Sequence, residues 1–535
     1  MSGFRFLGLI ILGVWAQTTN ATSIPSSGEI IRSLPQAPLL QRPQPEIRLE
    51  AESLRDLTPG GETLVVNEIA FKGNTIFSAD ELISALNFTS GQEFDLAGLR
   101  AMANDLSSLY RESGYSFAKV YLPRQDVSQG RVEFIVLEGT YGAIEATGEP
   151  DLIALVNDYL SELTTGSVIN GHRLESVVLT LGDVPGIRVA PILKPGKRVG
   201  EGDLAVEVIR DDGASGYSTI DNQGSRFSGE NRVSVGVTTP ATFGIGHELS
   251  LSTTRSNENL KVVSIGYGWP ISSRGGRFNF DYSYVSYDLT NNPDLEEIEG
   301  STRIYRGTFS HRLVRAQTTN VTFEYGAQLR KAYAINGTQV SSDGLFRTFP
   351  LRMSFDSRDS FWGGGSWEGS LVYTKGDIDD YQNEIFESWD KLALEITRTQ
   401  SLGKAVSAKW RIAGQGGEKA INDSSEQMSL GGIQGVRAYP SGEGSFTRAY
   451  VTQLEFQLNH DEFAPYVFVD HGNGFAHGTA ETTVREIGGY GFGFKAALGA
   501  WSIDGFFARK RNSEGSTADE THDNPIFQIS VQTRF

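Results

Sequence analysis

The sequence predicts a transmembrane β-barrel of about 16 antiparallel strands that follows two small α/β domains, and three observations predict it. Residues 213–535 show strand after strand with almost no helical pattern. These strands are about ten residues long and alternate between an apolar and a polar face, as barrel strands in lipid do. Upstream, between residues 62 and 212, a β-α-α-β-β order of elements occurs twice, which indicates an internal repeat.

The chain begins with a pattern typical of a secretory signal peptide, predicted over residues 1–21. Arg5 precedes an apolar run, and small residues follow it, with Ala16 and Ala21 as candidate last residues of the signal. A buried N-terminal helix is the alternative interpretation of the same run. No later stretch reaches the roughly 18 apolar residues that a membrane-spanning helix needs. The protein is therefore expected to leave the cytoplasm without a helical anchor.

Residues 22–61 are predicted to form a linker, because prolines recur along them and keep a chain extended. The segment SSGEIIRSL is the one place in this linker where a short helix is expected. The formal net charge of the chain is -18, which argues against nucleic acid as a partner, since phosphate binding needs a basic surface. Cysteine is absent, which excludes disulfides and suits a protein that crosses an oxidising compartment unfolded.

The first small domain is predicted over residues 62–140. A strand at LVVNEIAF precedes a short helix whose capping box pairs Ser78 with Glu81. A longer helix starts at Asp95, keeps apolar residues at helical spacing and stops at Gly114. The strands FAKVYL and RVEFIVLEG complete the unit.

The second small domain, predicted over residues 141–212, repeats this order. YGAIEATG reads as a strand, PDLIALVNDYLSEL and NGHRLESVVLTLGDVPG read as helices, and IRVAPILKPG and DLAVEVIRDD read as strands. Two copies of one β-α-α-β-β unit therefore separate the linker from the strand-rich region.

The strand-rich region, residues 213–535, is predicted to be the barrel. In RAYVTQLEFQLNH, Leu454, Phe456 and Leu458 fall on one face, whereas Glu455 and its polar neighbours fall on the other. A soluble β-sandwich also alternates in this way. Turn clusters recur about every 20 residues, which favours roughly 16 strands of a closed barrel with no exposed edge. The chain also ends inside a strand on an aromatic residue, Phe535.

Motifs of enzymes are absent from the sequence: there is no phosphate-binding loop, no G-x-S-x-G and no H-E-x-x-H. His471 stands beside Asp470 and could form a dyad, but no nucleophile accompanies the pair, so a structural histidine is favoured. His471 and His477 lie close in sequence without the spacing of a metal site. We therefore expect no enzyme activity, no metal and no cofactor.

Three stretches carry a family resemblance: GYSFAKVYLPRQDVSQGRVEFIVLEGTYGAIEATG, LGDVPGIRVAPILKPGKRVGEGDLAVEV and YSTIDNQGSRFSGENRVSVG. They resemble the outer-membrane transporters of two-partner secretion, the TpsB family of haemolysin secretion and activation proteins. The resemblance runs from about Gly28 to Phe535. It implies two periplasmic POTRA (polypeptide-transport-associated) domains, a 16-stranded barrel and the secretion of one large exoprotein. It also implies that SSGEIIRSL forms a helix that plugs the pore.

The resemblance further implies a lock inside the barrel. In this superfamily the loop between strands 11 and 12 folds back into the barrel, and its tip carries a V/I-R-G-Y tetrad. Here the tetrad reads Val436-Arg437-Ala438-Tyr439, with alanine where glycine is usual. Its arginine is expected to meet the aspartate of the wall motif F-x-D-x-G, for which a guanidinium offers a planar fork of donors. The motif residues here are Phe468, Asp470 and Gly472.

Without the resemblance, GVRAY in this glycine-rich stretch reads as a surface turn with a solvated arginine. The stretch is too polar and glycine-rich to be expected to hold itself. Alanine at position 438 matters only if the backbone there needs a positive φ, where glycine is favoured.

The implied function is translocation of an unfolded client, adhesin- or haemolysin-like, from the periplasm to the cell surface without a nucleotide. A client segment can add as a strand to an exposed sheet edge. We expect this at FAKVYL and the helix after Asp95, with the candidate residues Leu99, Leu106, Phe117, Val120, Tyr121 and Leu122. Other expected partners of the monomer are outer-membrane lipids and the barrel-assembly machinery, which is expected to recognise Phe535. A barrel assembly factor and a passive porin are the alternative functions.

Overall fold

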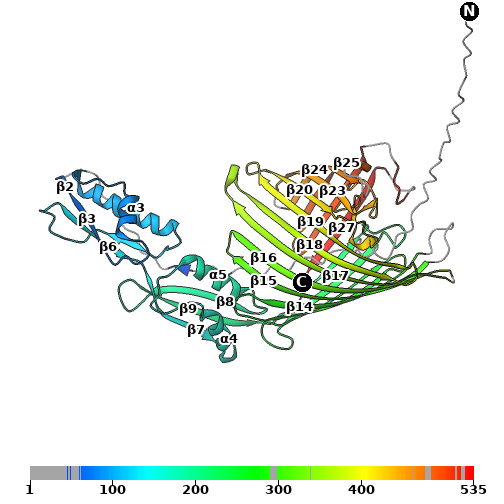
Figure 1. The fold of residues 1–535 in the computed structure, drawn as a ribbon, viewed down its shortest axis with the longest axis horizontal. Coiled ribbons are helices and arrows are strands. Elements are labelled where there is room, and N and C mark those ends of the chain that lie inside the picture. Colours follow the sequence, from blue (N-terminus) through cyan, green and yellow to red (C-terminus); the bar gives the residue numbers. More distant parts are fainter. Residues whose placement is uncertain are drawn as a thin grey trace, which may run out of the picture.

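The computed structural model describes residues 45, 48–49, 60, 62–289, 298–337, 339–460, 462–475, 483–511, 515–519 and 524–535. The predicted signal peptide, most of the predicted linker and the helix expected at SSGEIIRSL lie outside the described residues. Figure 1 shows two small α/β domains in a row on one side of a large barrel. We call the barrel end that faces these domains the domain end and the opposite end the outer end.

The first domain is built from β2 (Leu64–Val66), β3 (Glu68–Lys72), α2 (Ala79–Ala85), β4 (Gln92–Phe94), α3 (Leu96–Glu112), β5 (Lys119–Tyr121) and β6 (Arg131–Leu137). The strand order β3-β6-β5 gives one sheet, and β2 and β4 form a separate pair. The capping box at the start of α2 is confirmed, because Glu81 N donates to Ser78 Oγ and Ser78 N donates to Glu81. Asp95 caps α3 by accepting from Gly98 N at 2.7 Å.

The stretch LVVNEIAF forms two strands rather than the one predicted. The backbone N–H groups of Asn67 and Glu68 both donate to the carbonyl of Gly130, at 2.7 and 3.2 Å. This shared acceptor divides the stretch, so β2 pairs with β4 while β3 pairs with β6. The acceptor lies far along the chain, and alternation of residue types could not reveal it.

The second domain contains β7 (Thr140–Gly148), α4 (Pro150–Leu160), α5 (Gly171–Gly182), β8 (Gly186–Pro195) and β9 (Glu201–Asp211), in the predicted order. Its sheet has the order β1-β8-β9-β7. The added strand β1 (Arg48–Leu49) comes from the predicted linker and pairs with β8 in parallel. Two residues within a proline-rich stretch show no strand pattern, so the sequence did not predict β1.

The second domain is tied to the domain end of the barrel. Asp183, the C-cap residue of α5, accepts from Arg315 Nε at 2.8 Å and Nη2 at 3.1 Å. Arg312 also pairs with Asp183, and Arg274 Nε donates to Glu162 at 2.6 Å. These arginines lie on β15 and on the connection before β14, so α5 is fixed against the barrel rim.

In the part of the chain that is described, 16 strands close into an antiparallel barrel in which β10 pairs with both β11 and β27. In barrel order they are β10 (Ser215–Asp221), β11 (Arg232–Pro240), β12 (Glu248–Ser256), β13 (Lys261–Pro270), β14 (Arg277–Asp288), β15 (Ile298–Arg315), β16 (Thr319–Asn336), β17 (Gln339–Asp359), β18 (Gly365–Asp380), β19 (Ile385–Ser401), β20 (Val406–Gly416), β23 (Arg448–Leu458), β24 (Phe463–Phe475), β25 (Thr483–Leu498), β26 (Trp501–Lys510) and β27 (Ile526–Arg534). Among the described helices, none has the length and apolar character to cross a bilayer.

Alternation along the strands separates an apolar outer face from an inner face. On β24, Val467 and Val469 are 56% and 52% exposed, whereas Phe468 and Asp470 are buried. On β23, Leu454, Phe456 and Leu458 are exposed, in agreement with the predicted face. Outward apolar side chains beside inward polar ones suit a wall between lipid and lumen.

Candidate functional site

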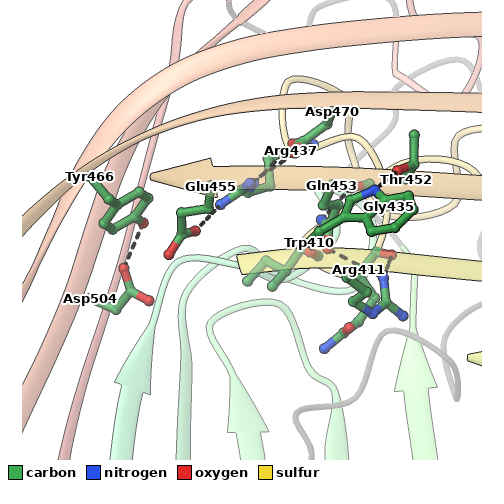
Figure 2. A network of polar contacts seen from close by, with 12 residues as sticks. Trp410, Arg411, Gly435, Arg437, Thr452, Gln453, Glu455, Tyr466, Asp470 and Asp504 are labelled. Atoms are coloured by element: carbon green, nitrogen blue, oxygen red, sulfur yellow. Dashed lines mark hydrogen bonds and ion pairs between the residues drawn. The ribbon is translucent and has the colours of Figure 1, made fainter. Parts of the chain in front are cut away.

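The long connection between β20 and β23, residues 417–447, folds back into the barrel, and we call it the lumen loop. It joins the eleventh and twelfth strands in barrel order, as the resemblance implied. Its base is pinched by the short pair β21 (Met428–Ser429) and β22 (Ser445–Phe446). Figure 2 shows Arg437, on the tip of this loop, beside side chains of the barrel wall.

The tip holds itself, contrary to the expectation for a glycine-rich stretch. Val436 N donates to Leu430 O at 2.7 Å, Gly432 N donates to Tyr439 O at 3.0 Å, and Tyr439 N donates to Val436 O at 3.0 Å. Leu430, Val436 and Tyr439 are fully buried. The tip is therefore a compact turn with its own backbone hydrogen bonds, and its apolar side chains pack against the wall.

Arg437 is bound by the wall carboxylate of Asp470 through three donors. Its Nε donates to Oδ2 at 2.9 Å, its Nη2 donates to Oδ1 at 2.8 Å, and its backbone N–H donates to Oδ2 at 3.0 Å. Both residues are buried, with Asp470 only 1% exposed. This two-pronged geometry fixes the orientation of the tip as well as its charge.

Glu455 on β23 is a second carboxylate partner that the sequence analysis did not identify. Arg437 Nη1 donates to Glu455 Oε2 at 3.0 Å (Figure 2). Lys495 Nζ donates to Glu455 Oε1 at 2.6 Å. Two cations thus face two anions, Asp470 and Glu455. The polar face of RAYVTQLEFQLNH was recognised, but the register that places Glu455 opposite Phe468 was not readable from one strand.

Aromatic rings enclose the guanidinium. The Cζ atom of Arg437 lies 3.5 Å from the ring centroid of Phe468 and 6.0 Å from that of Phe506. The two rings meet edge to face at 5.7 Å between centroids. An arginine over an aromatic face gains electrostatic attraction, and the gain is larger away from water. Phe468 of the wall motif is therefore a direct contact of Arg437.

Glycines on the wall make room for the tip. A Cβ at Gly472 would lie 3.3 Å from Val436 Cγ2, and a Cβ at Gly489 would lie 2.8 Å from the Cβ of Ala438. Ala438 does not have a positive φ. Alanine at this position therefore adopts its ordinary backbone conformation, and the missing side chain of Gly489 leaves space for its methyl group.

Two further sets of contacts hold the base of the lumen loop to the wall. Arg330 on β16 pairs with Asp423 at 2.5 Å, and both side chains are buried. Lys391 on β19 pairs with Glu426 at 2.8 Å. The loop is thus fastened near its start to β16 and β19, and at its tip to β23, β24 and β25.

Beside the loop, the lumen contains a polar cavity of about 660 Å³. Both positively and negatively charged residues line it. They lie on strands between β12 and β19 and on the lumen loop: Glu248, Asp281, Arg306, Glu324, Arg352, Lys391 and Glu426. Polar and apolar side chains both line the cavity, with Tyr267, Pro350 and Val372 among the apolar ones.

The candidate client residues of the first domain differ in burial. Leu99, Leu106 and Val120 are buried in the domain core, so their side chains are closed to a client in this structure. Tyr121 is 37% exposed. The edge of β5 is also partly covered, because Val120 N donates to Ser107 Oγ of α3 at 2.9 Å.

The other two candidates are half-buried. Phe117 packs against the core of the second domain, and Leu122 packs against the core of the first. The predicted client site thus reduces to the surface around Tyr121, and it stays a prediction. No set of three or more histidine, aspartate or glutamate side chains within the described ranges is placed to hold a metal ion.

A closed barrel of this size, with two small α/β domains at one end and a loop locked inside it, defines the class of outer-membrane barrels that transport polypeptides. The chain belongs to the family described as haemolysin secretion/activation protein ShlB/FhaC/HecB, whose profile matches residues 200–496. The profile of the POTRA domain, ShlB-type, matches residues 64–139. The protein is therefore a TpsB transporter of the outer membrane, with its POTRA domains in the periplasm.

Relatives agree over most of the chain. The heme/hemopexin transporter protein HuxB of Haemophilus influenzae (strain 86-028NP) is 26% identical over 95% of both chains. The outer membrane transporter CdiB of Dickeya dadantii is 22% identical over 82% of this chain and 81% of the relative. The solved structure of CdiB from Escherichia coli shares the fold, with a TM-score of 0.72, 18% identity and coverage of 89% and 91%. Members of the family are transporters that secrete an exoprotein through the barrel.

Proposed function

We propose that the client is captured unfolded at the first POTRA domain and passes through the lumen when the tip of the lumen loop leaves the wall. The observation that carries this proposal is the position of the loop: it occupies the lumen and is held there by polar contacts to Asp470 and Glu455. Such contacts can break and re-form without loss of the barrel, whose strands are joined by their own backbone pairs.

The client is proposed to be one large exoprotein, adhesin- or haemolysin-like, that carries its own signal peptide. The periplasm supplies no nucleotide, so folding of the client outside the cell supplies the direction of transport. HuxB is named for heme and hemopexin, and CdiB is named as an outer membrane transporter. At this level of identity the names do not fix the client of this chain.

Deletion of the first domain tests capture. A chain that lacks residues 64–139 should insert a barrel that still shifts in mobility on heating, and it should fail to export the exoprotein encoded beside its gene. The substitution Tyr121→Ala should reduce export in the full chain, whereas Val65→Ala, at an exposed apolar side chain on β2, should not. Undiminished export by the deleted chain would show that the first domain is not the capture site.

Phe535 is proposed to be recognised by the barrel-assembly machinery during insertion into the lipid bilayer. Its backbone N–H and C=O both bond to Gly216, at 3.1 and 2.7 Å, and its ring is 68% exposed. Deletion of Phe535 should lower the amount of folded, heat-modifiable protein in outer membranes. Wild-type amounts of folded protein after the deletion would contradict this role.

A further inference from the structure

The lumen loop carries a fully buried carboxylate, Glu443, which takes no part in the contacts of Arg437. Glu443 is 0% exposed. Its oxygens accept from Ser516 Oγ at 2.5 Å, Thr517 Oγ1 at 2.9 Å, Thr517 N at 3.0 Å and Ala518 N at 3.2 Å. Arg485 Nη2 on β25 donates to it at 2.7 Å. All donors except Arg485 belong to residues 516–518, in the connection between β26 and β27.

The side chain of Glu443 does not serve the tip itself. The tip uses the backbone carbonyl of Glu443, which accepts from Leu430 N at 3.0 Å and Gly431 N at 3.2 Å. The carboxylate points to parts of the chain 42 to 75 residues away. The carboxylate therefore joins the lumen loop to Arg485 and to residues 516–518, whereas backbone hydrogen bonds maintain the fold of the tip.

The segment that Glu443 holds leads on to the seam of the barrel. Asp519 N donates to Ser516 Oγ at 3.0 Å, and the carboxylate of Asp519 pairs with Arg226 Nη1 at 2.9 Å. Arg226 lies in the connection between β10 and β11, on the other side of the seam between β10 and β27. Contacts therefore continue from the lumen loop, through residues 516–519, to the far side of the seam.

The seam is the shortest pairing among the barrel strands that the structure describes. The register of β10 against β27 runs from Tyr217 to Asp221, with one further backbone contact at each end, Gly216 with Phe535 and Asn222 with Ile529. The register of β15 against β16 runs from Ile298 to Arg315 with one bulge. The connections above a short pairing contribute more to holding the two strands together. A contact chain that crosses the seam at its outer end is therefore placed where the barrel has fewest backbone bonds.

We propose that Glu443 is a positioning residue that couples the lumen loop to the outer mouth of the barrel above the seam. A buried carboxylate that loses its donors is costly, so the loop and residues 515–519 move together or separate only with a large penalty. Release of the tip from Asp470 then loosens residues 515–519 and, through Asp519, the connection that carries Arg226. This proposal rests on the proposed release of the lumen loop during transport. The contacts of Glu443 would connect that release to opening of the outer mouth.

Hydrogen–deuterium exchange on the full chain in detergent or nanodiscs tests the coupling without any client. Glu443→Gln keeps the shape of the side chain and removes its charge. We expect exchange in residues 515–519 to rise about tenfold or more, while residues 430–439 stay protected by their backbone bonds. Arg437→Ala, which does not contact residues 515–519, should raise exchange in that same segment.

Asp380→Asn is the matched control. Asp380 is a buried carboxylate that holds its own outer connection by accepting from Gln382 N and Asn383 N, both near 3 Å. Its substitution should change exchange only near residues 381–384. The coupling is overturned if Arg437→Ala leaves exchange in residues 515–519 at the wild-type rate. A failure of the proposed function would instead appear as transport that is indifferent to Arg437→Ala, with the exchange result unaffected.

Discussion

Two bidentate arginine–aspartate pairs hold separable parts of this transporter, and their carboxylates differ in exposure. Arg437 and Asp470 hold the lumen loop to the wall, and Arg315 and Asp183 hold the second POTRA domain to the barrel rim. The side chain of Asp470 is 0% exposed, whereas that of Asp183 is 24% exposed. The two arginine side chains are similarly buried, so the pairs differ in their carboxylates, one closed to water and the other partly exposed.

The partners of the two pairs also differ. Arg437 contacts two carboxylates, those of Asp470 and Glu455, and Lys495 is a second cation at Glu455. Asp183 is one carboxylate between two cations, Arg312 and Arg315. Asp183 also caps the C-terminal end of α5, where the helix dipole disfavours an anion. The two arginines offset this unfavourable position. Because the Asp183 side chain is partly exposed, water can solvate its carboxylate when the contact breaks.

From this difference we expect the lumen lock to hold its loop more firmly than the rim contact holds the second domain. A buried pair loses about 3–5 kcal/mol when one partner is removed, because the other charge remains buried alone. A pair at the surface contributes about 0–1 kcal/mol. Substitutions at the lumen lock should therefore change transport most, and substitutions at the rim should change it less.

The largest effect is expected from the lumen lock. Arg437→Ala and Asp470→Ala should each insert normally, because the barrel strands keep their pairs, and should lower secretion at least tenfold with altered channel conductance. The double variant should be no worse than the single variants, since residues that act as one unit are not additive. Secretion of the natural client and heat modifiability of the barrel measure the two properties. Defects that multiply in the double variant would mean that the two side chains act separately.

The members of this lock were predicted through the family resemblance, whose two motifs can each be matched within a few neighbouring residues, whereas the residues of GVRAY alone indicated a surface turn. Val436, Arg437 and Tyr439 lie in one short stretch, and Phe468, Asp470 and Gly472 alternate along one strand. The capping box at α2, in contrast, was predicted from the spacing of Ser78 and Glu81 without any resemblance. Local spacing fixes which face a side chain occupies.

The contacts that were missed depend on which segments become neighbours. Glu455 reaches Arg437 through the register of β23 against β24, and Glu443 reaches residues 516–518 only in the closed barrel. The division at Asn67 depends on the carbonyl of Gly130. Periodicity says nothing about register or about distant acceptors, so no inspection of one segment could have supplied these partners.

The next largest effect tests whether close packing, rather than charge alone, keeps the lumen lock in one state. In Gly489→Ala the new Cβ would lie 2.8 Å from the Cβ of Ala438 and 3.1 Å from Val436 Cγ1. Overpacking of this kind costs about 1–3 kcal/mol, so the tip should detach more often and the channel should open more often in planar bilayers.

Adding Ala438→Gly to Gly489→Ala removes the nearer methyl group and should restore most of the closed state. Gly416→Ala is the control, because a Cβ at Gly416 meets nothing within 4 Å. Equal opening of the single and the combined variants would show that the contact between positions 438 and 489 does not position the tip.

A smaller effect is expected at the rim. Asp183→Asn keeps the shape of the side chain but removes the anion between Arg312 and Arg315, at a cost of about 1 kcal/mol for a partly exposed pair. The second domain should sample a wider range of distances to the barrel in spin-label measurements, which the cysteine-free chain makes simple. Secretion should fall about two- to threefold, far less than in Asp470→Ala.

Asp211→Asn provides the matched control for the rim. Asp211 pairs with Arg188 at 2.9 Å within the second domain and does not bridge to the barrel. Its substitution should leave the distribution of distances unchanged. A loss of secretion in Asp183→Asn as large as in Asp470→Ala would contradict the ranking of the two pairs by burial.

The smallest effect on secretion is expected at Glu138, a carboxylate that neutral donors hold. Thr75 N donates to it at 2.6 Å, Ile76 N at 2.8 Å and Tyr110 OH at 2.9 Å. Burial acts to raise the pKa of Glu138, but the hydrogen bonds from Ile76 and Thr75 outweigh it and hold the pKa below its ordinary value. Ionised Glu138 therefore stabilises the first domain above an unfolded pKa of about 4.3, and this stabilisation is lost as the pH falls toward the lower folded pKa.

Glu138→Gln should lower the stability of the first domain at neutral pH by about 1–3 kcal/mol and remove the part of the acid sensitivity that Glu138 causes. Hydrogen exchange of residues 64–139 in the full chain, at neutral pH and near pH 4, measures both effects, with exposed Glu93→Gln as the control. Secretion at neutral pH should change little, because the domain stays folded. If Glu138→Gln instead abolished secretion while exchange stayed at the wild-type rate, Glu138 would act on the client directly. The burial of a carboxylate and the number of its donors would then not predict how strongly its substitution affects secretion. The expected difference between Asp470 and Asp183 would need another explanation.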